Sequence, residues 1–355
     1  MFWMKRVVVG GAAAAALVAG GCGDSTAPPA VDATAMATAV TGLNAALSQN
    51  AVLQSLAVLG GNGALGAIVG RAALAPVPAA GGDWATAASR AREALRELAA
   101  RAPTAPQALF PANVLGKTFQ WDTTSPAGYR ITDSTLAGAP ANGVRYRLYQ
   151  VDTATLDPSL PLTATGYVDL TDASTPQANV VQLLLRVGTQ TAADYDITEI
   201  RTTSSLTLTA VGYVTDVVTG GAPLNFNLSH ALSLADSSLS THYQASGSGM
   251  TVSLITLVSG SSGAPSLSVD WSVSRGGTIE VVGTTTAAAI NVAFKFNGAT
   301  AATVTGSPDN PSVTTAGGQV LTVTQLLALA TILQDFGEIY LNLSLLFVPG
   351  LLVFG

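Results

Sequence analysis

The chain has few side chains suited to chemistry: one cysteine, Cys22, and two histidines, His230 and His242, among 355 residues. A zinc site needs three or four nitrogen, sulfur or oxygen ligands, and two separated histidines do not provide them. A serine nucleophile on a sharp turn would follow a G-x-S-x-G pattern, and this pattern does not occur in the sequence. We therefore expect no catalytic residue, no metal and no cofactor.

His230 is the one candidate for contact with a ligand. It lies in the segment LNFNLSHALSL, where it shares an apolar side with Leu228 and Leu232. This position predicts a buried, hydrogen-bonded imidazole, and a ligand-contacting residue in a groove is the alternative. His242 lies on the polar side of its own segment, so we expect it to be solvated.

Gly61, Gly63 and Gly66 form a G-x-G-x-x-G run, and Asp83 follows about twenty residues later. In a dinucleotide-binding fold such glycines follow a β-strand and open a helix. Here they follow a segment with helical periodicity, and prolines interrupt the residues behind them. We interpret the glycines as a loop between helices.

Paired carboxylates would suit glycoside hydrolysis. Asp270 and Glu280 lie on the polar sides of their predicted strands. Glu199 shares a side with Tyr195 and Ile197, so we expect partial burial. Four further aspartates could ligate calcium, but no EF-hand loop joins them: Asp169, Asp172, Asp194 and Asp196.

Cys22 follows a segment with the order of an export signal. Lys5 and Arg6 precede an apolar run at 7–19, and two glycines come directly before Cys22. The apolar run is shorter than the ~20 residues that cross a bilayer as a helix. Residues 1–22 resemble the lipobox-type signal of bacterial lipoproteins, in which the cysteine becomes the first mature residue and carries a diacylglyceryl group.

This resemblance implies that Cys22 is lipidated and that the protein is anchored to a membrane of the bacterial cell envelope. Gly23, and not an acidic residue, follows the cysteine, which in such lipoproteins favours the outer over the inner membrane. We therefore expect a signal peptide at 1–21 and a flexible tether at 22–30, which is rich in small residues and proline.

The composition limits the other partners. The formal charge is −6, only 10% of the residues are charged, and lysine and arginine do not cluster. Nucleic-acid binding needs clustered basic residues, so we exclude it. A single cysteine allows no internal disulfide. The expected partners are the membrane, through Cys22, and a hydrophobic small molecule or an envelope protein.

Residues 31–111 predict a helical region. Apolar residues recur at helical spacing in its first segment, and a second segment continues to Gly60 and Gly61. A third helix is expected to follow Asp83 as its N-cap and to end before Pro103. The first apolar stripe is Met36, Val40, Leu43 and Leu47. The charged residues expected on a solvated face of the third helix are Arg92, Glu93, Arg96 and Glu97.

Residues 112–355 predict an antiparallel β domain with a C-terminal helix and a final strand. Polar and apolar residues alternate in about a dozen runs joined by short turns. The runs are 116–122, 143–151, 164–170, 179–187, 195–201, 205–214, 224–234, 240–246, 250–258, 266–274, 277–283 and 290–297. Residues 319–340 then show helical spacing, and 341–348 alternate again, which predicts the final strand.

The expected fold is α+β and mainly antiparallel: a large curved meander, half-barrel or barrel-like, packed with the N-terminal helices and the C-terminal helix. The first functional hypothesis is a non-enzymatic, membrane-anchored envelope lipoprotein that binds or shields an apolar ligand in its curved sheet. The alternatives are a surface-exposed structural or adhesive module, an exported hydrolase and a transmembrane β-barrel.

Overall fold

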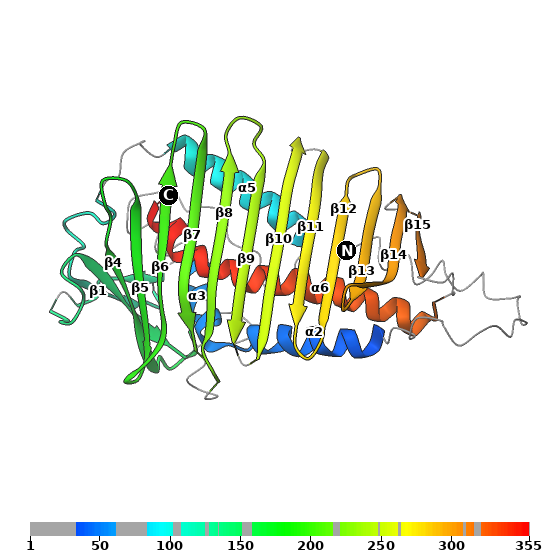
Figure 1. Ribbon diagram of the computed structural model, residues 1–355. Coiled ribbons are helices and arrows are strands. Elements are labelled where there is room, and N and C mark those ends of the chain that lie inside the picture. The colour runs from blue at the N-terminus through cyan, green and yellow to red at the C-terminus, as the bar shows by residue number, and fades with distance from the viewer. Residues whose placement is uncertain are drawn as a thin grey trace, which may run out of the picture.

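The computed structural model describes residues 33–61, 84–101, 108–124, 128–133, 135–150, 158–215, 221–247, 249–261, 264–307, 310–315 and 321–354. These residues form a sheet of 15 strands with helices packed on one of its faces (Figure 1). The prediction of an α+β fold made mainly of antiparallel strands is confirmed.

Each predicted run corresponds to a strand, and three strands were not predicted. The bounds are β1 Lys117–Trp121, β2 Tyr129–Arg130, β3 Gly143–Tyr149, β4 Ala164–Asp172, β5 Asn179–Val187, β6 Gln190–Arg201, β7 Ser205–Val214, β8 Leu224–Ser233, β9 Leu239–Gly247, β10 Met250–Ser261, β11 Ala264–Ser274, β12 Thr278–Thr285, β13 Ile290–Phe296, β14 Ala299–Ser307 and β15 Asn310–Thr315. The unpredicted strands are β2, β14 and β15. β2 is only two residues long, and β14 is built largely from alanine and threonine, which alternate little in polarity.

From β3 to β15 the sheet is a meander, because each strand pairs antiparallel with the next one along the chain. At the other end, β1 pairs in parallel with β3 and antiparallel with β2. β2 and β15 are the two edges and do not pair with each other. The sheet is therefore open between β2 and β15 and does not close into a barrel.

The alternation along each strand separates a buried face from an exposed one. In β8, Phe226, Leu228, His230 and Leu232 are buried, while Asn225, Asn227 and Ala231 are exposed. Successive side chains point to opposite faces of a strand, so a two-residue period buries one whole face. We call the face that packs on the helices the inner face and the opposite one the outer face.

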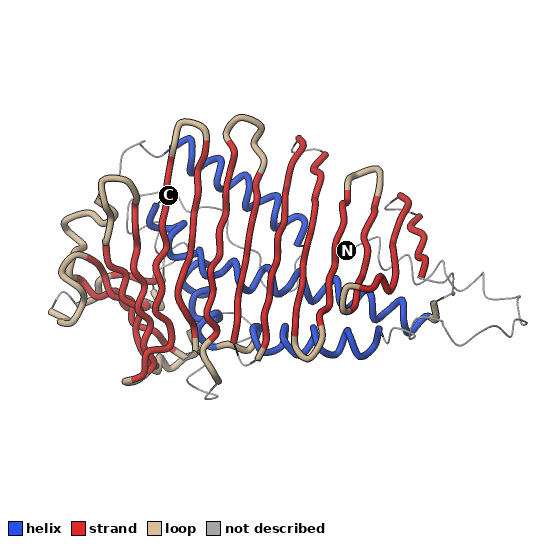
Figure 2. Tube along the Cα trace, in the orientation of Figure 1, coloured by secondary structure: helices blue, strands red, loops and turns tan. Residues whose placement is uncertain are grey.

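The helices lie on the inner face (Figure 2). The predicted helical region contains α2 (Ala33–Ser48), α3 (Ala51–Gly61) and α5 (Trp84–Arg101). The C-terminal region contains α6 (Val323–Ser344), the 3-10 turn η2 (Leu345–Phe347) and α7 (Val348–Phe354). Helices and sheet contribute to the same hydrophobic core, which includes the predicted stripe Met36, Val40, Leu43 and Leu47.

The prediction of a final strand at 341–348 is wrong, because these residues continue from α6 into η2 and α7. Leu341, Leu343 and Leu346 are all at most 4% exposed. The segment contacts the sheet on one side and α3 on the other. A helix that is enclosed in this way needs no polar face, so its sequence lacks the helical period that would identify it. The two polar residues at 342 and 344 happen to alternate with leucines, which resembles the pattern of a strand.

The C-terminal helical segment crosses the strands nearly at right angles. Its path is marked by Phe336 against Trp271 of β11, Tyr340 against Tyr243 of β9, Phe347 against His230 of β8 and Gly350 against Ile197 of β6. From 336 to 350, a helix advances ~21 Å at about 1.5 Å per residue. Five strand spacings measure ~24 Å at about 4.8 Å each. The two lengths are similar, so the helical segment runs nearly perpendicular to the strands and contacts several of them in turn.

Residues 323–351 are the one helical stretch in the described part of the chain that is long and apolar enough to cross a membrane. In its most apolar window, 67% of the residues are buried. Its position across the inner face of the sheet accounts for this hydrophobicity.

Candidate functional site

His230 lies in the inner layer, where β8, β9 and η2 meet. Its side chain is 3% exposed, and its Nε2 atom shares a hydrogen bond with the hydroxyl of Tyr243. The imidazole also stacks on Phe347, with ring centroids 4.3 Å apart. The prediction of a buried, hydrogen-bonded histidine is confirmed.

The surroundings of His230 keep it uncharged. Burial lowers the pKa of His230 to about 3, because the imidazolium form would lose its hydration. Burial also raises the pKa of Tyr243 well above its usual range, and the neighbouring Tyr340 acts in the same direction. The pair is therefore a neutral imidazole and a neutral phenol within the protein.

Aromatic rings continue this layer along α6. Tyr243 stacks on Tyr340 at 5.0 Å, and Trp271 stacks on Phe336 at 5.9 Å. Trp271 is fully buried, and its Nε1 donates to the Thr256 hydroxyl at 2.9 Å. These side chains fill the space between β8–β11 and the helix, so the layer around His230 is a packed core rather than an open groove.

His242 lies one strand away from His230 but on the opposite face, where it is exposed as predicted. In the described part of the chain, neither histidine forms a hydrogen bond with a serine or a carboxylate. The geometry that a Ser-His-Asp mechanism requires is therefore not assembled around either residue.

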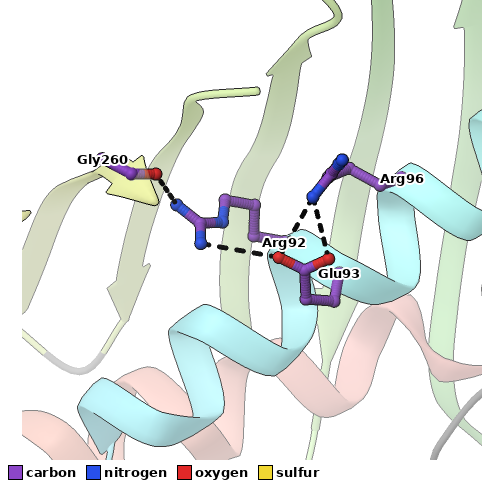
Figure 3. Close-up of polar contacts among 4 residues, drawn as sticks. All are labelled: Arg92, Glu93, Arg96 and Gly260. Carbon is purple, nitrogen blue, oxygen red and sulfur yellow. Dashed lines mark hydrogen bonds and ion pairs between the residues drawn. The ribbon is translucent and has the colours of Figure 1, made fainter. Parts of the chain in front are cut away.

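Arg92 of α5 is buried, and the prediction that it lies on a solvated face is wrong. Its side chain is 2% exposed, and its Nη1 donates to the main-chain oxygen of Gly260 at 3.1 Å (Figure 3). Gly260 has a φ of +81°, which favours glycine. Glu93 and Arg96 do lie on an exposed face, where they form an ion pair at 3.1 Å. Arg92 differs because its long side chain reaches a carbonyl at the end of β10.

Glu199 and Arg201 of β6 hold the C-terminal end of α5. Glu199 is 2% exposed and accepts hydrogen bonds from Arg201 at 2.7 Å and from Asn179 at 2.6 Å. Arg201 also donates to the main-chain oxygens of Leu98 and Ala99, at 3.1 and 3.2 Å. A cation at the last carbonyls of a helix is favourable. Glu199 is thus a positioning partner for α5, not a free carboxylate.

A polar network joins α2 to α6. Three of its contacts join residues that are 294 positions apart in the sequence. Because each step along α2 is matched by an equal step in the same direction along α6, the two helices run parallel. The contacts are Thr41 Oγ1 to Asp335 Oδ2 at 2.5 Å, Asn44 Nδ2 to Asp335 Oδ1 at 2.9 Å, Asn44 Nδ2 to Glu338 Oε2 at 2.5 Å and Asn342 Nδ2 to Ser48 Oγ at 3.0 Å. Both carboxylates take part in helix packing.

An open groove of about 390 Å³ lies beside β4. Among the described residues that line it, Asp172 is the one with an acidic or basic side chain. The two carboxylate oxygens of Asp172 accept main-chain hydrogen bonds from Leu109 at 3.1 Å and Ser174 at 2.9 Å. Asp172 therefore shapes the surrounding loops. The lining residues are Ala108, Phe110, Leu115, Asn142, Asp172, Ser174, Thr175 and Pro176.

The outer face of the central strands carries mainly hydroxyl and amide side chains, together with the exposed apolar residues Ile255 and Leu257 of β10. Across β8–β11 it contains one carboxylate, Asp270, and one histidine, His242. The outward residues include Asn225, Asn227, Ser229, Ala231, Ser240, His242, Gln244, Ser246, Thr251, Ser253, Ile255, Leu257, Ser266, Ser268, Asp270 and Ser272. Such a surface can exchange many neutral hydrogen bonds with a partner.

Several predicted features lie outside the described residues: the lipidation site Cys22, the glycines Gly63 and Gly66, and the N-cap Asp83. Within the described residues, no group of three or more His, Cys, Asp or Glu side chains could hold a metal ion. Sequence reasoning missed the burial of Arg92 and the α2–α6 network. The uncharged polar positions Thr41, Asn44 and Ser48, at helical spacing, were the available signal for that network.

Comparisons of the chain with protein-family models, with curated proteins and with solved structures give no match.

Proposed function

We propose that the chain is a non-enzymatic lipoprotein of the bacterial envelope, anchored through an acylated Cys22 to a membrane, the outer rather than the inner one. In this proposal the outer face of its sheet is the surface that contacts other envelope molecules. The signal-like order of residues 1–22 supports the anchor.

The observation that carries the surface role is the filled inner face. Tyr243 and Trp271 are fully buried and stack on Tyr340 and Phe336 of α6, and His230 beside them is neutral. The apolar side of the sheet is thus occupied by the chain's own C-terminal segment. The outer face, with its serine, threonine, asparagine and glutamine side chains, is the broad surface left for a partner.

We further infer that the sheet acts as a half-barrel around its own helix. Strand twist accumulates over many strands and curves an open sheet. In this proposal the apolar group that the sheet shields from water is the chain's own C-terminal segment, α6, η2 and α7. The most apolar window of this segment is two-thirds buried.

The test is to express the full chain in a host that processes lipoproteins and to measure the mass of the mature protein. We expect a mature chain that begins at Cys22 and carries acyl chains, and membrane fractionation that is lost in Cys22→Ser. A membrane-free chain with an unmodified Cys22 would contradict the proposal.

A second candidate is carriage of an apolar ligand with a polar head group. The observation in its favour is that two buried polar atoms, His230 Nδ1 and the Tyr195 hydroxyl, have no hydrogen-bond partner among the described residues. Native mass spectrometry with lipid extraction of the Cys22→Ser protein distinguishes ligand carriage from the surface role. A co-purifying hydrophobe supports carriage, and a ligand-free mass supports the surface role.

A further inference from the structure

The first turns of α2 and α6 lie at the same end of the molecule. Because the helices run parallel with a repeated offset of 294 residues, Ala33 lies beside Leu327. Both helix starts are at the end of the sheet where β13 to β15 lie (Figure 1). Thr322 and Gln325 form a capping box that fixes the first residue of α6.

Apolar side chains are exposed at this end. Val323 is 50% exposed and Leu327 is 47% exposed, and they lie one turn apart on the same side of α6. Charged groups are scarce here, because α2 contains none and residues 297–334 contain one, Asp309. A surface with few charges loses little hydration free energy when it meets the interfacial region of a bilayer.

The chain length before α2 limits how far this end can lie from the proposed anchor. Cys22 precedes Ala33 by eleven positions. A fully extended chain of that length spans at most ~40 Å. An acylated cysteine lies at the membrane surface, so the start of α2, and Leu327 beside it, stay near the bilayer.

We propose that the α2–α6 end of the domain faces the membrane and that Val323 and Leu327 enter the interfacial region of the bilayer. This inference rests on the proposed acylation of Cys22. The tether raises the local concentration of the domain at the membrane, so two half-exposed side chains orient the domain without binding strongly by themselves. Because α6 crosses the strands nearly at right angles, β13–β15 lie nearest the bilayer and β1–β5 farthest from it.

The test measures depth in vesicles of phosphatidylethanolamine and phosphatidylglycerol. With Cys22 acylated, single cysteines introduced by Val323→Cys, Leu327→Cys or Val211→Cys can be labelled with an environment-sensitive fluorophore. Val211 is the matched control, because it is 49% exposed but lies on β7, far from the helix starts. We expect quenching by doxyl-labelled lipids to be at least about twofold stronger at 323 and 327 than at 211.

A charge provides the second comparison. Leu327→Asp should lower the quenching of a label at 323 to the level seen at 211, whereas Val211→Asp should leave it unchanged. Equal quenching at all three labelled positions in an acylated chain would overturn this inference alone. A mass that shows Cys22 unmodified would overturn both the proposed function and the inference.

Discussion

His230 of β8 and Phe347 of η2 stack with their ring centroids 4.3 Å apart, which joins the middle of the sheet to the C-terminal segment. The stacked imidazole is neutral, because burial lowers the pKa of His230 to about 3. The unfolded chain would bind a proton at this residue near pH 6.5.

His230 should make the fold sensitive to acid. Between pH 6.5 and pH 3 the unfolded state binds a proton at His230 that the folded state does not, so stability falls as the pH falls. The expected loss is about 3–5 kcal/mol over that range, and His230→Gln should remove it. Urea unfolding at several pH values measures the difference. His242→Gln is the control, and equal pH slopes in wild type and His230→Gln would refute the prediction.

Replacement of Arg201 by methionine should be strongly destabilising. The change leaves Glu199, which is 2% exposed, without its cation, and removes the donor to two carbonyls of α5. We expect a loss of about 3–5 kcal/mol in the free energy of unfolding, partly recovered in the Glu199→Gln/Arg201→Met double variant. The control is Arg96→Met. Arg96 belongs to an exposed ion pair on α5, so this change should alter stability by less than about 1 kcal/mol. Similar losses in the two single variants would count against the prediction.

Gly350 should not tolerate alanine although it lies in a helix. A Cβ there would lie 2.6 Å from Cγ2 of Ile197, a fully buried side chain. We expect Gly350→Ala to cost about 1–3 kcal/mol, and to cost less in an Ile197→Ala background, which removes Cγ2 but leaves Cβ of residue 197 at 3.2 Å and Cε2 of Phe354 at 3.1 Å. Gly42→Ala in α2, where nothing lies within 4 Å of the added methyl group, should stabilise by about 0.5–1 kcal/mol. Calorimetric unfolding of Gly350→Ala, Ile197→Ala, their double variant and Gly42→Ala measures these changes in stability. If the losses of the two single variants simply add in the double variant, the predicted clash between residues 350 and 197 is contradicted.

Asp335 should hold α2 in place. Asp335→Ala leaves the Thr41 hydroxyl and one Asn44 contact without their acceptor, and Asn44 is only 7% exposed. We expect a loss of about 2–4 kcal/mol and faster amide hydrogen exchange throughout α2. Thr331→Ala removes an exposed hydroxyl from the same helix and should have little effect. Unchanged exchange in α2 would show that its apolar stripe alone positions it.

The sequence by itself determined the strands with clear two-residue periodicity, the inward position of His230, and the apolar stripe of α2. These features depend on neighbouring residues in the chain, because burial of one face imposes its period locally. The lipid anchor at Cys22 stays a prediction from the sequence.

Only the tertiary structure decided the helical state of 341–348, because a segment enclosed by sheet and α3 shows no polar face that would reveal its period. It also decided that the sheet stays open, since closure depends on how twist adds up over all strands. Arg92 became a core residue through a carbonyl 168 positions away, and Asp335 received its donors from a helix 291 or more positions earlier. Contacts over such separations leave no periodic pattern in the sequence, so only the folded chain brings them together.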